Sequence, residues 1–270
     1  MRIVLVGPGR AGTALALAMQ RAGHDVVAVA GRDPAQAEDA AAMLRAEPRS
    51  IGEPLPAADV VLIAVRDGAI AEVAAVLAPT VGDAGGVVHI SGATPVGALD
   101  PIAATGIPTG SFHPLQTLPD PETGADRLGT AWVAVTAPSP LRETLHELAA
   151  SFGGRAFDLD GDQKATYHAA AAAASNFPVA ALAVSHDLFV AAGVPFEAAA
   201  PLVDAIVANA FELGPHAALT GPVARGDSET VAAQLAAVAV ETPEWERAYR
   251  AFVTATADVA GTADEFEDLA

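Results

Sequence analysis

The stretch from Lys164 to His168 places an ammonium and an imidazole at the start of an alanine-rich segment that predicts a long helix over residues 162–192. At about 100° per residue, Lys164 and His168 lie about 40° apart on this helix, and Ser175 falls between them. Asn176 lies about 120° from Lys164, so it reaches the same face only if Pro178 bends the helix. We predict Lys164 and His168 as catalytic residues, with Ser175 and Asn176 as substrate-binding residues.

Lys164 is the only lysine among 14 basic residues, and no other cation follows it before Arg225. Burial on an apolar helix lowers the pKa of an ammonium toward the range in which it exchanges a proton with a substrate. Arginine cannot replace it there, because its guanidinium does not release its proton. The alternative interpretation is a surface ion pair between Lys164 and Asp160 or Asp162.

A glycine pattern supplies the second chemical signal. It follows an expected strand at residues 2–6 and opens an expected helix at residues 10–21, and it consists of Gly7, Pro8, Gly9, Arg10, Ala11 and Gly12. In this context GxGxxG predicts a dinucleotide site, with a tight turn at Gly7, close approach of a pyrophosphate at Gly9 and close helix packing at Gly12. The pyrophosphate is expected at the N-terminus of the helix, where free N–H groups favour anions.

The end of the second expected strand, residues 25–30, indicates which dinucleotide binds. An NAD site usually has Asp or Glu here, whereas this chain has Gly31 and Arg32. Gly31 leaves space and Arg32 offers a bidentate partner for a 2′-phosphate, which predicts NADP(H). In the alternative, Arg32 is a solvated residue, and Asp33 caps the next helix in either case.

Three further segments are expected at the carboxyl edge of the sheet, where ligands of such folds bind. Val65 and Arg66 follow the third expected strand, and Ser91 and Gly92 follow the fourth, beside the nicotinamide. His113 and Gln116 follow a short strand at residues 109–112, and we predict that both bind substrate. The alternatives are an ordinary loop hydroxyl for Ser91 and a structural role for His113.

The first half of the chain must position these residues on a doubly wound parallel sheet, because β-branched runs alternate with alanine-rich helical segments. Further strands are expected at 59–65, 87–90, 131–136 and 155–159, and helices at 34–44, 69–77 and 140–151. After residue 160 only helices are expected: 162–192, 196–213, 228–240 and 243–260. We predict a Rossmann domain at 1–160 and an all-α domain at 161–270.

In the second domain, Asp227 is expected to cap the helix that begins at residue 228, whereas Arg225 has no structural explanation and is predicted to bind a substrate carboxylate or, in the alternative, to reach a neighbouring subunit. The formal net charge of −19 disfavours nucleic acid and anionic membranes as partners. No signal peptide or membrane span is expected, so we expect a cytoplasmic protein. The chain has no cysteine, which excludes thiolate metal sites, and no metal is expected.

Several motifs together resemble a known family. They are the GxGxxG pattern, His-x-Ser-Gly at 89–92, Ser-Phe-His-Pro-Leu-Gln at 111–116, Lys-x-x-Tyr-His at 164–168 with Ala-Ser-Asn at 174–176, and Thr-Gly-Pro-x-x-Arg-Gly-Asp at 220–227. Over nearly the whole chain they resemble the Rossmann-like oxidoreductases with a C-terminal helical domain of unknown function. More distantly, the architecture is similar to 6-phosphogluconate dehydrogenase with its C-terminal helical domain, the β-hydroxyacid dehydrogenases, ketopantoate reductase and pyrroline-5-carboxylate reductase.

In the β-hydroxyacid dehydrogenases, a lysine on a helix contacts the substrate and an asparagine follows one turn later; here Lys164 matches the lysine, and His168 stands in place of the asparagine. The resemblance implies hydride transfer between NADP(H) and a carbonyl or imine of a small carboxylated metabolite. The alternatives are an NADP(H)-binding sensor without turnover and an NADPH:deazaflavin oxidoreductase. The apolar helical domain is expected to form a homodimer.

Overall fold

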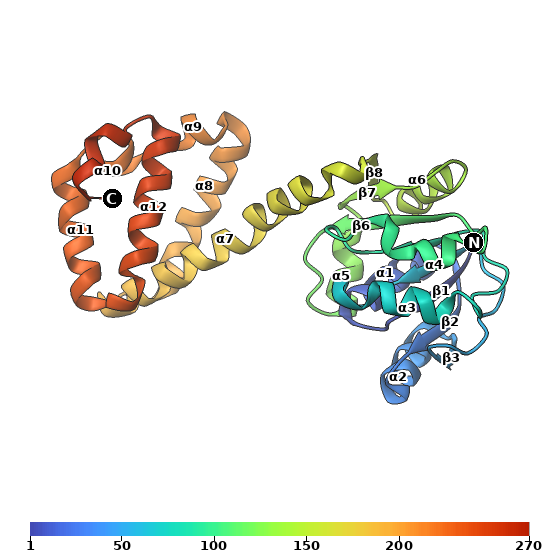
Figure 1. Ribbon diagram of the computed structural model, residues 1–270. Coiled ribbons are helices and arrows are strands. Elements are labelled where there is room, and N and C mark those ends of the chain that lie inside the picture. Colours follow the sequence, from blue (N-terminus) through green and yellow to red (C-terminus); the bar gives the residue numbers. More distant parts are fainter. Residues whose placement is uncertain (270) are drawn as a thin grey trace. The chain divides into compact units, whose positions relative to one another are not determined.

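A computed structural model describes residues 1–269, and its contacts divide the chain into two units. The first unit runs from Met1 to Ala171, and the second begins at Ala172. The division falls inside a long helix, α7 (Lys164–Ala191), whose first residues belong to the first unit (Figure 1). Within the described residues, no helix is long and apolar enough to cross a membrane.

The first unit is built on one sheet of eight strands in the order β3-β2-β1-β4-β5-β6-β7-β8. Their bounds are β1 (Arg2–Val6), β2 (Asp25–Gly31), β3 (Glu47–Ser50), β4 (Val60–Ile63), β5 (Val87–His89), β6 (Thr109–Leu115), β7 (Trp132–Thr136) and β8 (Arg155–Asp158). All neighbours pair in parallel except β6 and β7, which are antiparallel. The predicted doubly wound sheet is confirmed, with this one antiparallel pair as an exception.

Alternate residues of the central strands contribute to two hydrophobic cores, one on each face of the sheet, because successive side chains point to opposite faces. Ile3 and Leu5 face one core, and Val4 and Val6 face the other. Helices α1 (Arg10–Arg21), α2 (Pro34–Leu44), α5 (Pro121–Leu128) and α6 (Leu141–Ser151) cover the first face. Helices α3 (Ile70–Leu77) and α4 (Asp100–Ala103), with the 3-10 turn at Val96–Leu99, cover the second.

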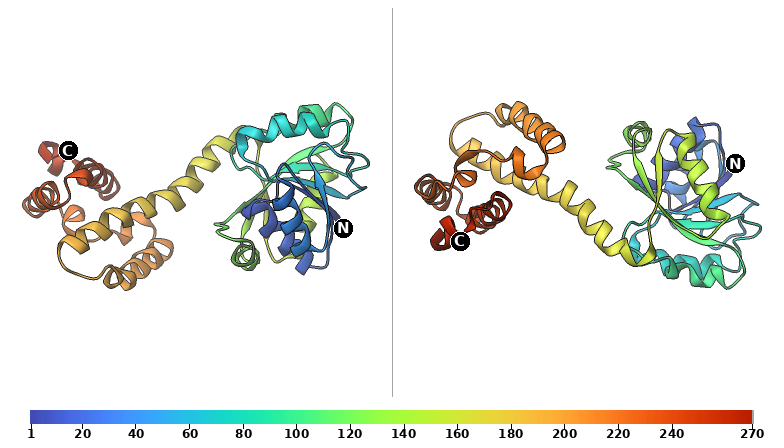
Figure 2. Two further views of the ribbon diagram at one scale, coloured as in Figure 1. Left: turned by 90° about the horizontal axis from the view of Figure 1, so that it is seen from below. Right: turned by 90° about the horizontal axis from the view of Figure 1, so that it is seen from above.

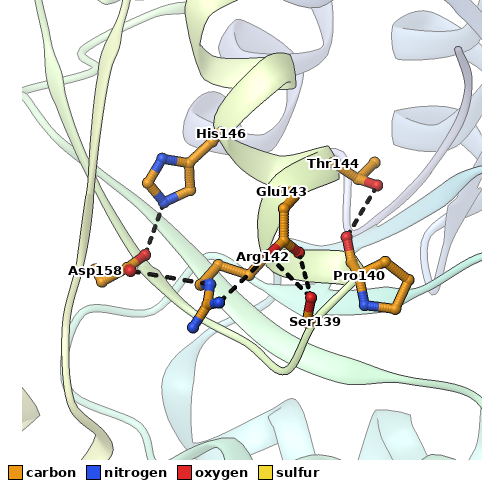
Figure 3. A network of polar contacts seen from close by, with 7 residues as sticks. All are labelled: Ser139, Pro140, Arg142, Glu143, Thr144, His146 and Asp158. Atoms are coloured by element: carbon orange, nitrogen blue, oxygen red, sulfur yellow. Dashed lines mark hydrogen bonds and ion pairs between the residues drawn. The ribbon is translucent and has the colours of Figure 1, made fainter.

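A polar network joins α6 to β8 on the surface of the first unit (Figure 3). His146 donates from Nε2 to Asp158 at 2.7 Å, and the Arg142 guanidinium lies 3.9 Å from the same carboxylate. The Ser139 hydroxyl lies 2.9 Å from both carboxylate oxygens of Glu143. These side chains are more than a third exposed, so solvent screens the ion pairs and they contribute little to the stability of the fold.

The second unit contains the rest of α7, then α8 (Ala200–Leu213), α9 (Pro215–Ala218), α10 (Gly221–Ala224), α11 (Ser228–Glu241) and α12 (Glu246–Ala260). The last two lie side by side, as the ribbons in Figure 2 show. The apolar cluster between them contains Val231, Leu235, Val253 and Ala257, together with Phe266. Indole Nε1 of Trp245 donates to Asp187 at 2.7 Å and so ties α7 to the start of α12.

The structure confirms the predicted strands and long helices and adds elements that were not predicted. These include β3 at the sheet edge, the short α4, α5 between β6 and β7, and the short α9 and α10 of the second unit. Strands end at Asp158, close to the predicted change of period at 160. The predicted caps are also present: Asp33 accepts from the N–H of Ala35 at 3.1 Å, and Asp227 accepts from the N–H of Thr230 at 3.1 Å.

Candidate active site

The glycine loop connects β1 to α1 and has the shape that its sequence predicts. Gly7 has φ +91°, and a Cβ there would lie 2.7 Å from Cγ1 of Val65. At Gly12 a Cβ would lie 2.6 Å from that of Ala64, so only glycine lets α1 pack this closely on β4. A Cβ at Gly9, in contrast, would meet nothing within 4 Å. The backbone is open at the one glycine where a pyrophosphate must approach, and no side chain caps α1 there.

Arg32 follows β2 and is exposed, and it makes no ion pair within residues 1–269. Its neighbour Gly31 is buried, and a Cβ there would lie 3.0 Å from Cβ of Ala37 and 3.3 Å from Cδ of Pro8. Packing of α2 and of the glycine loop therefore explains why Gly31 has no side chain. The Asp33 carboxylate is engaged in capping α2, which leaves the Arg32 guanidinium available to an anion.

The turn after β5 is tightly organised around Ser91. Its hydroxyl accepts from the N–H of Ala93 at 3.2 Å and of Thr94 at 3.0 Å, and lies 2.9 Å from the Thr94 hydroxyl. These bonds fix the loop beside Gly92. On the next loop, Val65 lies against Gly7, and Arg66 is exposed.

Lys164, the first residue of α7, is 2% exposed and lies at this edge of the sheet. Its Nζ donates to the carbonyl oxygen of Ser91 at 3.2 Å and to the hydroxyl of Ser111 at 2.9 Å. Burial lowers the pKa of the ammonium from its usual 10.5 to about 8, and the negative charge of Asp67 opposes that shift. Neither Asp160 nor Asp162 pairs with Lys164, so the surface ion pair that the sequence left open is absent among the described residues.

His113 lies on β6 and contacts the same helix. Its Nδ1 is 2.7 Å from the hydroxyl of Tyr167, and the two rings meet edge to face with centroids 5.5 Å apart. Burial, and then the positive charges of Lys164 and His168, lower the pKa of His113 to about 4. The imidazole of His113 is therefore neutral at physiological pH.

His89, the last residue of β5, is fully buried beneath the turn. Its Nδ1 accepts from the N–H of Ser91 at 3.2 Å, so the proton of the neutral ring is on Nε2. Burial and the charge of Lys164 lower the pKa of His89 to about 4. Of Lys164, His89 and His113, Lys164 is thus the group whose pKa lies nearest to neutral pH, which is what a proton donor requires.

The remaining predicted residues occupy different places. His168 is exposed, with its ring centroid 6.4 Å from that of His113. Gln116 is exposed beyond the end of β6 and accepts from the N–H of Thr117 at 2.8 Å. Ser175, Asn176 and Arg225 belong to the second unit and are exposed. The structure therefore brings Lys164, His113, Ser91 and Gly92 together in the first unit.

Three residues of this cluster were absent from the predicted site: His89, Ser111 and Tyr167. Each lies within a motif that the sequence displays, but the contacts of Ser111 and Tyr167 join residues that are 53 and 54 positions apart in the chain. Alternation along β6 was a usable signal, because the buried Phe112 requires Ser111 and His113 to face the opposite side of the sheet.

Two family models match the chain. Residues 1–114 match a Rossmann-like domain, and residues 131–256 match a domain of unknown function, DUF2520. No curated protein matches the chain. The first match covers the glycine loop, Arg32 and His113, and the second covers Lys164, Tyr167 and most of the helical unit.

Solved structures with the same fold cover almost the whole chain. A Bacteroides fragilis protein described as a candidate NADP oxidoreductase is 26% identical, with a TM-score of 0.80 over 95% of this chain and 98% of its own. A Thermotoga maritima protein is 23% identical, with a TM-score of 0.73 over 97% and 99%. A 1-pyrroline-5-carboxylate reductase of Streptococcus pyogenes is 18% identical, with a TM-score of 0.62 over 100% and 99%.

Proposed function

Because the chain joins a Rossmann-like domain to a DUF2520 domain, we propose that it is an NADP(H)-dependent oxidoreductase. Its substrate is a small carboxylated metabolite with a carbonyl or imine in the oxidised form and a hydroxyl or amine in the reduced form. The observation that carries this proposal is a buried lysine with a pKa of about 8 at the edge of a dinucleotide-type sheet. The name of the Bacteroides fragilis structure supports the same reaction class.

The glycine loop fits the cofactor, since the open position at Gly9 and the uncapped start of α1 accept a pyrophosphate. Arg32 would hold the 2′-phosphate, and Val65, Arg66, Ser91 and Gly92 would line the path toward the nicotinamide. When bound, the cofactor supplies or accepts the hydride.

The chain itself handles the proton. Two N–H groups of Lys164 are bonded to Ser91 and Ser111, and no group within residues 1–269 accepts from the third, which can donate to the substrate oxygen or nitrogen that gains negative charge. His113, being neutral, contributes a hydrogen bond without competing for that proton. In the oxidative direction, neutral Lys164 accepts the proton instead. His168, Gln116, Ser175, Asn176 and Arg225 are proposed to position the substrate.

The first expected result concerns pH. Reduction requires protonated Lys164, so kcat/KM for reduction should fall about tenfold for each pH unit above about 8. Oxidation should show the opposite trend and level off above about pH 8. Initial rates of NADPH consumption between pH 6 and 10 check this, and a reduction rate that stays constant to pH 10 contradicts Lys164 as the donor.

The second expected result concerns cofactor choice. Arg32→Ala should weaken NADPH binding about 10- to 100-fold, because a charge-assisted bond to a phosphate contributes about 1.5–3 kcal/mol. NADH binding should hardly change, since NADH has no 2′-phosphate. Fluorescence titration of both nucleotides checks this. Arg2→Ala is the matched control, because Arg2 is an exposed arginine at the opposite end of β1.

The same titration separates the alternatives. Equal binding of NADH and NADPH by the wild type contradicts the NADP preference, and no binding at micromolar concentration contradicts the dinucleotide site. NADPH binding without turnover of any keto acid or cyclic imine favours an NADP(H)-binding sensor. Reduction of a deazaflavin by NADPH favours an NADPH:deazaflavin oxidoreductase.

We also propose a homodimer formed through the helical unit. Helix α8 is rich in apolar residues, yet no residue between Ala200 and Leu213 is buried, and Phe211 is 90% exposed. At about 100° per residue, Phe211 and Leu202 lie on opposite sides of α8. Exposed apolar side chains thus lie on more than one side of α8, as is typical of a helix that is covered, so a second copy is the proposed cover.

A further inference from the structure

The ring of His113 is held from three sides. A Cβ at Gly92 would lie 2.9 Å from both Cε1 and Nε2 of the imidazole and 3.1 Å from Nδ1, so the ring lies against the bare backbone of Gly92. The hydroxyl of Tyr167 lies 2.7 Å from Nδ1, and the centroid of the His168 ring lies 6.4 Å from that of His113, with an interplanar angle of 71°. Gly92 is therefore a glycine because His113 occupies the space that any side chain would fill.

Tyr167 is itself fixed in place. Its ring centroid lies 6.0 Å from that of Phe157 on β8, in addition to the edge contact with His113. It follows Lys164 by three residues on α7, so one helical turn supplies both the ammonium and the phenol. The only hydrogen bond of the phenol among the described residues is the one to His113.

The protonation states determine the direction of that bond. Burial raises the pKa of Tyr167 to about 12, and burial with the charges of Lys164 and His168 lowers the pKa of His113 to about 4 despite Asp67. Both groups are therefore neutral between about pH 5 and 11. Of the two neutral groups, the phenol is the stronger hydrogen-bond donor and the imidazole nitrogen is the stronger acceptor. The phenol therefore donates to Nδ1, and the ring proton of His113 is on Nε2.

We propose that Tyr167 is a positioning residue that holds His113 in the tautomer with its proton on Nε2. His113 then presents a neutral N–H donor at Nε2, and this donor can bind only an electron-rich acceptor such as a carbonyl or carboxylate oxygen. That this carbonyl or carboxylate oxygen belongs to a substrate rests on the proposed function, whereas the tautomer of His113 does not depend on it. In this proposal Lys164 supplies the proton, and His113 orients the acceptor oxygen of the substrate.

The tautomer can be measured without substrate or cofactor. Long-range ¹H–¹⁵N correlation spectra of the full-length, deuterated protein resolve the two nitrogens of each of its seven histidines, and His113→Gln assigns the signals. In the wild type, we expect a pyridine-like Nδ1 and a pyrrole-like Nε2 for His113. In Tyr167→Phe, the two shifts should move toward a common average, and the pKa of His113 should rise because Nδ1 is no longer engaged.

Tyr249→Phe is the matched control, because Tyr249 is the other tyrosine of the chain and lies in the second unit. It should leave the His113 signals unchanged. A pyrrole-like Nδ1 in the wild type, or a Tyr167→Phe spectrum identical to that of the wild type, overturns the inference. If the variant does not fold, the wild-type spectrum still decides the tautomer. If the wild type instead shows no NADPH-dependent turnover, the proposed function is overturned but the tautomer is not. The failure of one proposal can therefore be distinguished from the failure of the other.

Discussion

Replacing Lys164 by methionine is expected to lower turnover about 10²- to 10⁴-fold, the range by which a positioned acid or base accelerates a reaction. NADPH should bind to Lys164→Met as it does to the wild type, because the glycine loop and Arg32 are unchanged. The measurement is NADPH oxidation against a panel of keto acids and cyclic imines, with nucleotide binding followed by fluorescence. Wild-type turnover in the variant contradicts the catalytic assignment.

The same variant should not unfold more easily. The pKa of Lys164 is lowered from 10.5 to about 8, so the charged form is disfavoured in the folded chain, and folding stability rises with pH between about 8 and 10.5. Methionine removes the cost of burying the ammonium charge, but it leaves the Ser91 carbonyl and the Ser111 hydroxyl without their donor. We therefore expect the free energy of unfolding at pH 7 to stay equal or to rise by about 1–2 kcal/mol. Urea denaturation at pH 7 and pH 10 checks this.

Lys164→Arg is the control for charge. It keeps a positive charge near Ser91 and Ser111 but cannot release a proton, so it should not restore turnover. If Lys164→Arg is fully active, the lysine acts only as a fixed charge. If Lys164→Met loses both stability and NADPH binding, its role is structural.

Phe211→Asp is expected to weaken the proposed dimer at least 100-fold, because a carboxylate in an apolar interface costs several kcal/mol. The side chain of Phe211 is 90% exposed in the single chain, so the substitution should leave the fold of the helical unit intact. Light scattering after size-exclusion chromatography measures the mass against the 27.0 kDa of one chain. Circular dichroism verifies that the helices are retained.

Val76→Asp is the matched control, because it adds the same charge at an exposed apolar position of α3, in the first unit. We expect this variant to remain dimeric. A wild type that is monomeric at micromolar concentration contradicts the proposed dimer, and a dimeric Phe211→Asp places the interface elsewhere.

The sequence predicted those parts of the fold whose signals are local. The glycine loop, the strand before it and the caps at Asp33 and Asp227 depend on neighbouring residues only. The edge strand β3 was missed because Glu47–Ser50 is charged and contains Pro48, as edge strands often are, and so shows no apolar alternation. Helix α5 was missed although Asp120 caps it and Pro121 begins it, because Gly124 interrupts its apolar pattern.

The site was harder to predict, because its contacts connect distant segments. A helical projection of α7 groups Lys164 with His168 and Ser175, but the residue of this helix that forms a hydrogen bond with His113 is Tyr167. Its partner His113 comes from a strand 54 residues earlier, and the space for that ring is provided by Gly92 on a third segment. Such three-way contacts depend on strand order and register, which a single sequence does not specify.

The burial of Lys164 has a consequence for chemical labelling of the molecule. Since the chain has no other lysine, its solvent-facing side chains offer no primary amine at all. Amine-directed cross-linkers and acylating dyes find only the α-amino group on the outside, and trypsin can cleave a folded molecule only after arginine. The one ε-amine is accessible only where a small reagent can enter the proposed substrate site, so its rate of acylation is a direct probe of that site.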